Sequence, residues 1–219
     1  MTVRQRTADA RTMRPLLADN RALPADARER LSRYLDLLAK WNRVYNLTAI
    51  RDRAQMESHH VRDALAVLPF LPDAPSLRLL DVGSGGGVPG IPLAIARPHW
   101  QVTLVDSNHK KVAFLTQAAI ELGLSNVRAI ASRVEALRSQ DPFDVVISRA
   151  FSDLGTFASL AAPHVARDGV LVAMKGALPR EEIDALPSHV RVAATPSLAV
   201  RGVDAERRLV IMRIEREDA

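Results

Sequence analysis

The sequence predicts a doubly wound α/β domain that follows a helical N-terminal segment. After Pro75, apolar strand-like runs alternate with helical patterns, which is typical of a largely parallel sheet. Before Pro75, the apolar residues recur at helical spacing instead. A chain of 219 residues with 47% hydrophobic and 25% charged residues has room for one core with an appendage. The absence of cysteine excludes a disulfide framework, thiolate zinc sites, iron–sulfur clusters and a cysteine nucleophile.

Residues 25–75 are expected to form a helical cap. The first helix is predicted from Ala25 to Trp41, and a second from Arg53 to Leu68, where Pro69 ends it. The first helix buries one stripe of residues spaced three and four apart: Leu31, Tyr34, Leu35, Leu38 and Trp41.

Residues 76–219 are expected to form the α/β domain with a seven-stranded sheet. No long helical pattern separates its last two strands, so the last strand is predicted to run antiparallel to the others. The expected strands cover residues 77–82, 101–105, 127–131, 143–148, 170–174, 190–194 and 208–214, with helices at 110–122 and 154–165.

The charge balance favours a polyanionic partner. The net charge is +5 and the sequence pI is about 10.2, and residues 1–33 hold eight arginines against four acids. Residues 1–24 lack periodicity, so a disordered basic arm and an arm that contacts nucleic acid are both open. No run approaches the roughly 18 apolar residues of a membrane span, and no apolar signal core is present. We therefore expect a cytoplasmic protein without a membrane partner.

A glycine-dense turn follows the first predicted strand of the domain. It matches G-x-G-x-x-G at Gly85, Gly87 and Gly90, and Asp106 closes the next strand about twenty residues later. Glycines let the backbone approach a ligand, and a carboxylate at that position accepts hydrogen bonds from ribose hydroxyls. Loop and acid together predict a site for an adenosine-containing cofactor.

Asp81 decides between the possible cofactors. It lies two residues before Gly83, where a negative charge suits the ammonium and sulfonium groups of S-adenosylmethionine better than a pyrophosphate. A methyltransferase is therefore favoured over an NAD-dependent oxidoreductase that uses the same glycines and Asp106. A non-enzymatic RNA-binding or assembly protein that keeps the fold as a scaffold is the third alternative.

Several motifs resemble those of the bacterial ribosomal RNA small subunit methyltransferase G family, also called the glucose-inhibited division protein B family. The resemblance extends from about Leu31 to the end of the chain. The motifs are Trp41-Asn42-Arg43-Val44-Tyr45-Asn46-Leu47-Thr48, Asp81-Val82-Gly83-Ser84-Gly85, Val88-Pro89-Gly90-Ile91-Pro92-Leu93, Ser132-Arg133-Val134-Glu135, Ile147-Ser148-Arg149-Ala150-Phe151, Lys175-Gly176 and Glu206-Arg207-Arg208-Leu209, together with His60 and Asp63.

The resemblance implies a Rossmann-like class I methyltransferase that methylates nitrogen 7 of a guanine in a decoding-region loop of 16S rRNA. It implies contacts with S-adenosylmethionine at Gly83, Val88, Val134, Glu135 and Arg149, to which the sequence pattern adds Asp106. Another RNA, a protein or a small molecule is the alternative methyl acceptor. Nitrogen 7 of guanine carries a lone pair and no proton, so we expect no general base. No metal is expected either, because the spacing of His60 and Asp63 could bind a metal but the rest of such a site is lacking.

The partner is expected to be 16S rRNA or the small ribosomal subunit, bound by a monomer. The candidate phosphate contacts are Arg133, Lys175 and Arg207, with Arg208, Arg43 and Arg51 as further candidates. Phe151 is expected either to stack on the target base or to pack in the core. His60 and Asp63, three apart on one helix face, are interpreted as a structural pair that faces the cofactor domain.

Overall fold

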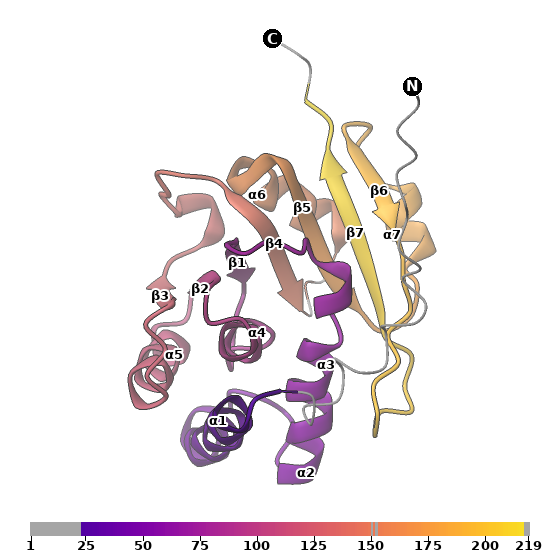
Figure 1. Ribbon diagram of the computed structural model, residues 1–219. Helices are drawn as coiled ribbons and strands as arrows, with labels where there is room; N and C mark the ends of the chain where they lie inside the picture. The colour runs from indigo at the N-terminus through magenta and orange to yellow at the C-terminus, as the bar shows by residue number, and fades with distance from the viewer. Residues whose placement is uncertain (1–22, 150, 152, 217–219) are drawn as a thin grey trace, which may run out of the picture.

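The computed structural model describes residues 23–149, 151 and 153–216. Its centre is a seven-stranded sheet in the order β3-β2-β1-β4-β5-β7-β6 (Figure 1). The strands are β1 (Arg78–Val82), β2 (Gln101–Asp106), β3 (Val127–Ala131), β4 (Phe143–Arg149), β5 (Val165–Lys175), β6 (Val190–Ala194) and β7 (Arg208–Ile214). Most of residues 1–24, the predicted basic arm, lie outside the described part.

Strands β1 to β5 are parallel, and β7 is antiparallel to both of its neighbours, β5 and β6. The predicted antiparallel last strand is confirmed. Because β1 is flanked by β2 and β4, the carboxyl ends of these three strands meet at one edge of the sheet. Ligands of such folds bind at this edge.

The helices that follow the strands are α4 (Gly90–Ala96), α5 (His109–Glu121), α6 (Leu154–Ala161) and the short α7 (Arg180–Asp184). The predicted helix 154–165 was too long, because it gives way to a 3₁₀ turn, η5 (Ala162–His164), that contains Pro163. Val165 already pairs with Phe143 of β4, so β5 begins five residues before the predicted strand. A buried β-branched residue after a helix-breaking proline favours the sheet over another helical turn.

The N-terminal segment consists of α1 (Ala25–Tyr45), α2 (Arg53–Met56), a π-helical turn η2 (Glu57–Arg62), α3 (Asp63–Leu65) and the 3₁₀ turn η3 (Leu68–Phe70). The prediction of one regular helix from 53 to 68 was therefore wrong in its middle. The first helix extends one turn beyond Trp41 and ends at Asn46, whose φ of 47° is left-handed. A π turn widens the helix and changes the direction of the side chains that follow, and it is frequent at functional sites.

Two hydrophobic clusters lie on the two faces of the sheet. One cluster joins α1, α3, α4 and α5 to the face of β1 that carries Leu79, with Leu35, Leu65 and Phe114 among its members. The other packs α6, through Phe157, against the opposite face. The N-terminal helices thus share a core with the sheet, and the boundary at residue 75 stays a prediction. Within the described ranges, no helix has the length and apolar character that crossing a membrane requires.

Candidate active site

A cleft of about 380 Å³ opens at the carboxyl ends of β1 and β2. It brings together six residues singled out in the sequence: Gly83, Asp106, Arg133, Val134, Glu135 and Phe151. The remaining lining residues are Val82, Val105, Ser107, Lys111, Ser132 and Leu160. Apolar walls with carboxylates at the rim suit a nucleoside, which has flat apolar faces and polar edges.

Two glycines of the turn have different structural tasks. Gly83 has a φ of 70°, and no heavy atom lies within 4 Å of the place where a Cβ would stand. Its backbone therefore faces open space at the cleft. Gly90, by contrast, begins α4 against the sheet, where a Cβ would collide with Leu104 Cδ2 and lie 2.8 Å from Asp81 Oδ2. Gly90 is thus explained by close packing of the helix on the sheet.

Asp106 ties the glycine turn to β2. Its Oδ2 accepts a hydrogen bond from the Gly85 N–H at 3.0 Å, and its Oδ1 accepts one from the Asn108 N–H at 2.9 Å. The Lys111 ammonium lies 3.7 Å from Oδ2. Each carboxylate oxygen has two lone pairs, so these contacts leave acceptor capacity at the cleft. The predicted contact with ribose hydroxyls stays a prediction.

Asp81 is fully buried behind this turn. Its Oδ2 accepts the Gly90 N–H at 3.0 Å, whereas its Oδ1 has no hydrogen-bond partner. Burial raises the pKa of Asp81 to about 7, although the Gly90 N–H and Arg149 oppose the shift. A buried, partly unsatisfied carboxylate is stabilised in its charged form by a nearby cation. This site therefore fits a cofactor with positively charged groups.

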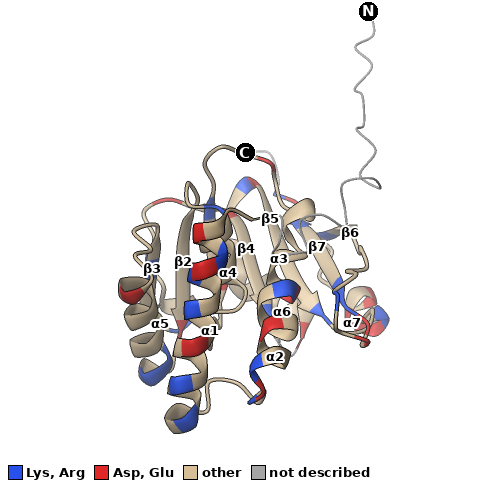
Figure 2. Ribbon diagram, turned by 60° about the horizontal axis from the view of Figure 1, so that its bottom comes forward, with Lys and Arg blue, Asp and Glu red and all other residues tan. Residues whose placement is uncertain are grey.

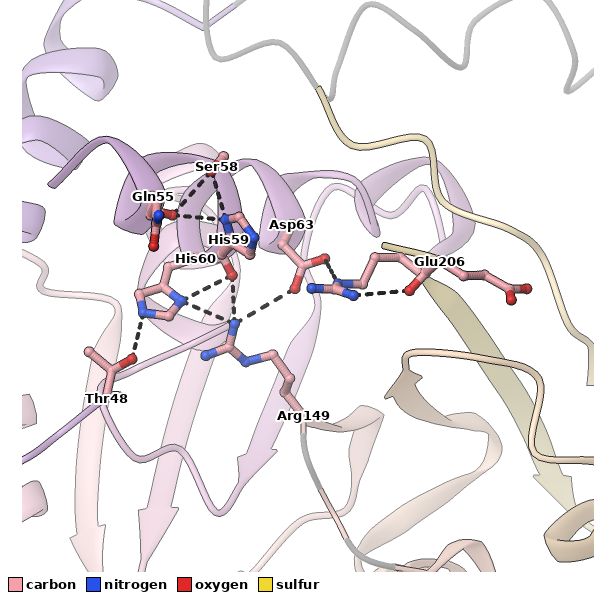
Figure 3. Close-up of polar contacts among 9 residues, drawn as sticks. Thr48, Gln55, Ser58, His59, His60, Asp63, Arg149 and Glu206 are labelled. Carbon is pink, nitrogen blue, oxygen red and sulfur yellow. Dashed lines mark hydrogen bonds and ion pairs between the residues drawn. The ribbon is translucent and has the colours of Figure 1, made fainter. Parts of the chain in front are cut away.

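Val88 and Arg149 do not line the cleft. Val88 is buried in the cluster on the face of the sheet that the N-terminal helices cover. The Arg149 guanidinium turns toward the π-helical segment, where Nη1 donates to the His59 carbonyl at 2.8 Å and contacts His60 Nδ1 at 3.2 Å (Figure 3). The cofactor contacts implied for these two residues stay predictions, and for Arg149 they require a different side-chain position.

Asp63 joins Arg149 to Arg207, which lies just before β7. Asp63 Oδ2 lies 3.7 Å from Arg149 Nη1, and Oδ1 lies 3.4 Å from Arg207 Nε, an ion-pair distance without hydrogen-bond geometry. We call His60, Asp63, Arg149 and Arg207 the polar network. Burial raises the pKa of Asp63, and the two arginines act in the opposite direction.

His60 is the neutral member of the polar network. Burial, with a further contribution from Arg149, lowers its pKa to about 4. Its Nδ1 faces Arg149, and its Nε2 lies 2.9 Å from Thr48 Oγ1. The structure agrees with the interpretation of His60 and Asp63 as a structural pair facing the sheet. Their three-residue spacing was the sequence signal, but it did not indicate that two arginines converge on Asp63.

The remaining candidates for RNA contacts differ in how exposed they are and in whether they already have partners within the protein. Arg133 is exposed at the rim of the cleft and has no ion-pair partner within the described residues. Lys175 is nearly buried, and its ammonium donates to Glu182 Oε2 at 2.7 Å and to the Phe151 carbonyl at 3.2 Å. The Phe151 ring lines the cleft and lies 5.5 Å from the ring of Phe157, so it packs in the core and also reaches the site.

Among the residues described, no three His, Asp or Glu side chains form a group that could hold a metal ion.

Comparison with known protein families decides the family. The sequence model described as rRNA small subunit methyltransferase G matches residues 27–211. The chain belongs to this family. Two proteins named ribosomal RNA small subunit methyltransferase G are similar to it over most of their length. The one from Chromobacterium violaceum is 54% identical over 85% of this chain and 88% of its own. The one from Laribacter hongkongensis is 52% identical over 86% and 90%.

Solved structures support the fold of this methyltransferase G family member. TrmN from Thermus thermophilus matches with a TM-score of 0.55 and 22% identity, over 69% of this chain and 48% of that protein, so this chain spans about half of its length. Precorrin-6y C5,15-methyltransferase from Geobacter metallireducens matches with a TM-score of 0.52 and 15% identity, over 68% and 87%. The predicted class I methyltransferase fold is confirmed, and the dinucleotide alternative is set aside.

Proposed function

We propose that this protein transfers a methyl group from S-adenosylmethionine to nitrogen 7 of a guanine in 16S rRNA. One observation carries the proposal: the family match over residues 27–211 contains a cleft with Gly83 and Asp106 at the carboxyl edge of the sheet. Naked rRNA, the small subunit and an assembly intermediate are the candidate forms of the substrate. A monomer and a cytoplasmic location remain predictions.

The cleft residues fit the methyl donor. S-adenosylmethionine, when bound, supplies an electrophilic methyl group on a sulfonium, whose carbon–sulfur bond breaks as the new carbon–nitrogen bond forms. Gly83 would offer its backbone to the donor, and Asp106 would accept from ribose hydroxyls. Val134 and Glu135 would contact the adenine edge from the turn after β3. The buried Asp81 carboxylate contributes negative charge near the end of β1, which favours a cationic ligand.

The protein's task toward the guanine is positioning. Nitrogen 7 attacks with its own lone pair, so no side chain has to remove a proton. The chain has to hold the base in line with the methyl group, exclude water and accommodate positive charge that moves to the imidazole ring. Phe151, at the wall of the cleft, is placed to pack against a flat ring.

Transfer of a labelled methyl group tests the proposal. The substrates are purified 30S subunits and naked 16S rRNA from cells that lack this protein, followed by mapping of the modified nucleotide. Label on one loop guanine at nitrogen 7 is the expected result. Label on another RNA, a protein or a small molecule, with none on either rRNA substrate, would overturn the assigned acceptor but keep the cofactor.

A further inference from the structure

An exposed aromatic residue lies at the end of α1, outside the cleft and the polar network. Tyr45 is 41% exposed and its neighbour Val44 is 71% exposed, and they are two of the three large hydrophobic residues that are exposed in the described part of the chain. Isolated surface apolar residues are ordinary. An aromatic ring surrounded by cations is a more specific arrangement, because it matches the faces and phosphates of single-stranded nucleic acid.

The Tyr45 ring packs against a neighbouring aromatic ring on its buried side. It lies 5.3 Å from the ring of Trp41, which in turn lies 5.6 Å from the ring of the fully buried Phe114 in α5. Tyr45 therefore ends a line of three rings that runs from the core to the surface. A ring fixed in this way loses little conformational freedom when a ligand stacks on it.

Lys110 lies at the same end of the helix pair as Tyr45, because α1 and α5 run antiparallel. Arg33, in the first half of α1, donates to the Glu121 carbonyl at the end of α5, whereas Trp41 meets Phe114. Tyr45 lies one turn beyond Trp41, and Lys110 lies one turn beyond Phe114 in the same direction. Figure 2 shows basic residues on both helices at this end, and α1 carries further ones toward its other end.

Two further arginines extend the basic surface. Arg43 and Arg51 are both exposed, and Arg51 Nη2 donates to Asn46 Oδ1 at 3.3 Å. The nearby acid Asp52 is occupied as the cap of α2, where it accepts the Gln55 N–H. Arg43 and Lys110 have no ion-pair partner within the described ranges. We call Arg43, Val44, Tyr45, Arg51 and Lys110 the tyrosine patch.

The tyrosine patch borders the proposed active site. Lys111, the neighbour of Lys110, lines the cleft and pairs with Asp106. On the other side, Leu47 touches the glycine turn, because a Cβ on Gly86 would lie 3.7 Å from the Leu47 carbonyl oxygen. Tyr34, which lies in α1 as Tyr45 does, donates to the Gly86 carbonyl at 2.6 Å. The surface is therefore connected to the cleft through Lys111 and to the glycine turn through Leu47.

We propose that the tyrosine patch binds the single-stranded RNA that flanks the target guanine, with an unpaired base stacked on Tyr45 and phosphates on Arg43 and Lys110. The proposal rests on the proposed function for the identity of the substrate. Bases of RNA loops are commonly stacked on aromatic side chains, and any base offers a suitable face. The charge of the patch selects RNA over an apolar protein segment.

The first test compares Tyr45→Ala with Tyr45→Phe. Ile120→Ala is the matched control, because Ile120 is 69% exposed at the opposite end of α5. Tyr45→Ala is expected to raise the KM for rRNA about tenfold, as loss of one stacked base would, with the affinity for S-adenosylmethionine unchanged. Tyr45→Phe and Ile120→Ala are expected to match the wild type. An unchanged KM in Tyr45→Ala, or an equal loss in Tyr45→Phe, would overturn the stacking role.

A binding assay separates this proposal from the proposed function. Fluorescence anisotropy with a labelled RNA hairpin that has a purine-rich loop needs no methyl transfer. Lys110→Ala is expected to reduce the slope of log affinity against log salt by about one, and Arg30→Ala, at the far end of α1, to leave it unchanged. If the wild type transfers no methyl group to rRNA, the proposed function fails, and Tyr45→Ala binding the hairpin as tightly as the wild type refutes the patch. A defect of Tyr45→Ala on 30S subunits but not on naked RNA would indicate a protein partner and overturn the RNA assignment.

Discussion

The cleft and the polar network lie at the same edge of the sheet but use their charged groups in opposite ways. In the cleft, Glu135 and Arg133 are exposed, and Asp106 is held mainly by backbone N–H groups. In the polar network, Asp63 is nearly buried and lies between two guanidinium groups. The cleft therefore keeps charges available for ligands, whereas the polar network pairs its charges with one another.

The difference changes how the predicted site residues are interpreted. Arg149 and Arg207 were expected to bind cofactor and RNA, and both have partners on or near the N-terminal helices. To bind a ligand they must exchange or share these partners. Arg133 and Arg43 have no such requirement, so they are the RNA candidates that the structure leaves most available.

The largest expected effect is on stability and concerns Asp63. Asp63→Ala leaves two partly buried guanidiniums without their shared carboxylate, and we expect a loss of about 3 kcal/mol in the free energy of unfolding. Asp36→Ala is the control, because the Asp36–Arg53 pair is exposed and is worth less than about 1 kcal/mol. Urea denaturation measures both variants. Equal losses of unfolding free energy in the two variants would show that the polar network is no stronger than an ordinary surface ion pair.

The next prediction concerns the affinity of the cleft for the cofactor. Asp106→Ala removes the acceptor for the Gly85 N–H and the predicted ribose contact. We expect the affinity for S-adenosylmethionine to fall by about 1–3 kcal/mol, the scale of a hydrogen bond to a charged group. Isothermal titration calorimetry tests it, with Asp141→Ala, an exposed acid at the opposite edge of the sheet, as control. Unchanged affinity would remove Asp106 from the cofactor site.

A smaller effect is expected from pH. The pKa of Asp81 is about 7 in the folded protein and about 3.9 in the unfolded chain, so the folded state binds more protons between these values. The contribution of Asp81 to the stability of the wild type therefore falls as the pH rises from 4 through 7. Asp81→Asn has no such proton, so its stability relative to the wild type should rise by about 1.4 kcal/mol between pH 6 and pH 8.

The Asp81 test is made without cofactor, by urea denaturation of both proteins at each pH. His60 contributes in the opposite direction, since its pKa of about 4 lies below the unfolded value and costs stability as the pH falls below 6.5. This contribution is shared by both proteins and cancels in the difference. Parallel stability profiles would show that Asp81 does not carry the shift.

The smallest expected effect distinguishes two basic residues. Lys175 is already bound to Glu182 and to a backbone carbonyl, so Lys175→Ala should change RNA affinity less than about twofold. Arg133→Ala should lower it more and reduce the salt slope by about one. Anisotropy titrations at several salt concentrations measure both. A larger loss in the lysine variant would mean that RNA displaces Glu182.

Much of the sheet was predictable because strand and helix periods are local properties. The strands at 127–131, 190–194 and 208–214 have the predicted bounds, and the antiparallel last strand followed from the missing crossover helix. The predicted helix 154–165 failed at its end, because pairing of Val165 with Phe143 is a long-range contact. The π turn in residues 57–62 also has no periodic signal.

The site shows the same division between sequence and tertiary structure. The sequence by itself determined the glycine turn, the placement of Asp106 after the second strand of the sheet and the family motifs, since these depend on residue type and short spacing. Only the tertiary structure decided that Asp106 holds the Gly85 N–H, that Arg149 turns away from the cleft and that Trp41 meets Phe114. The physical reason is that these contacts join elements far apart in the chain, and their geometry exists only after the sheet and its helices have packed.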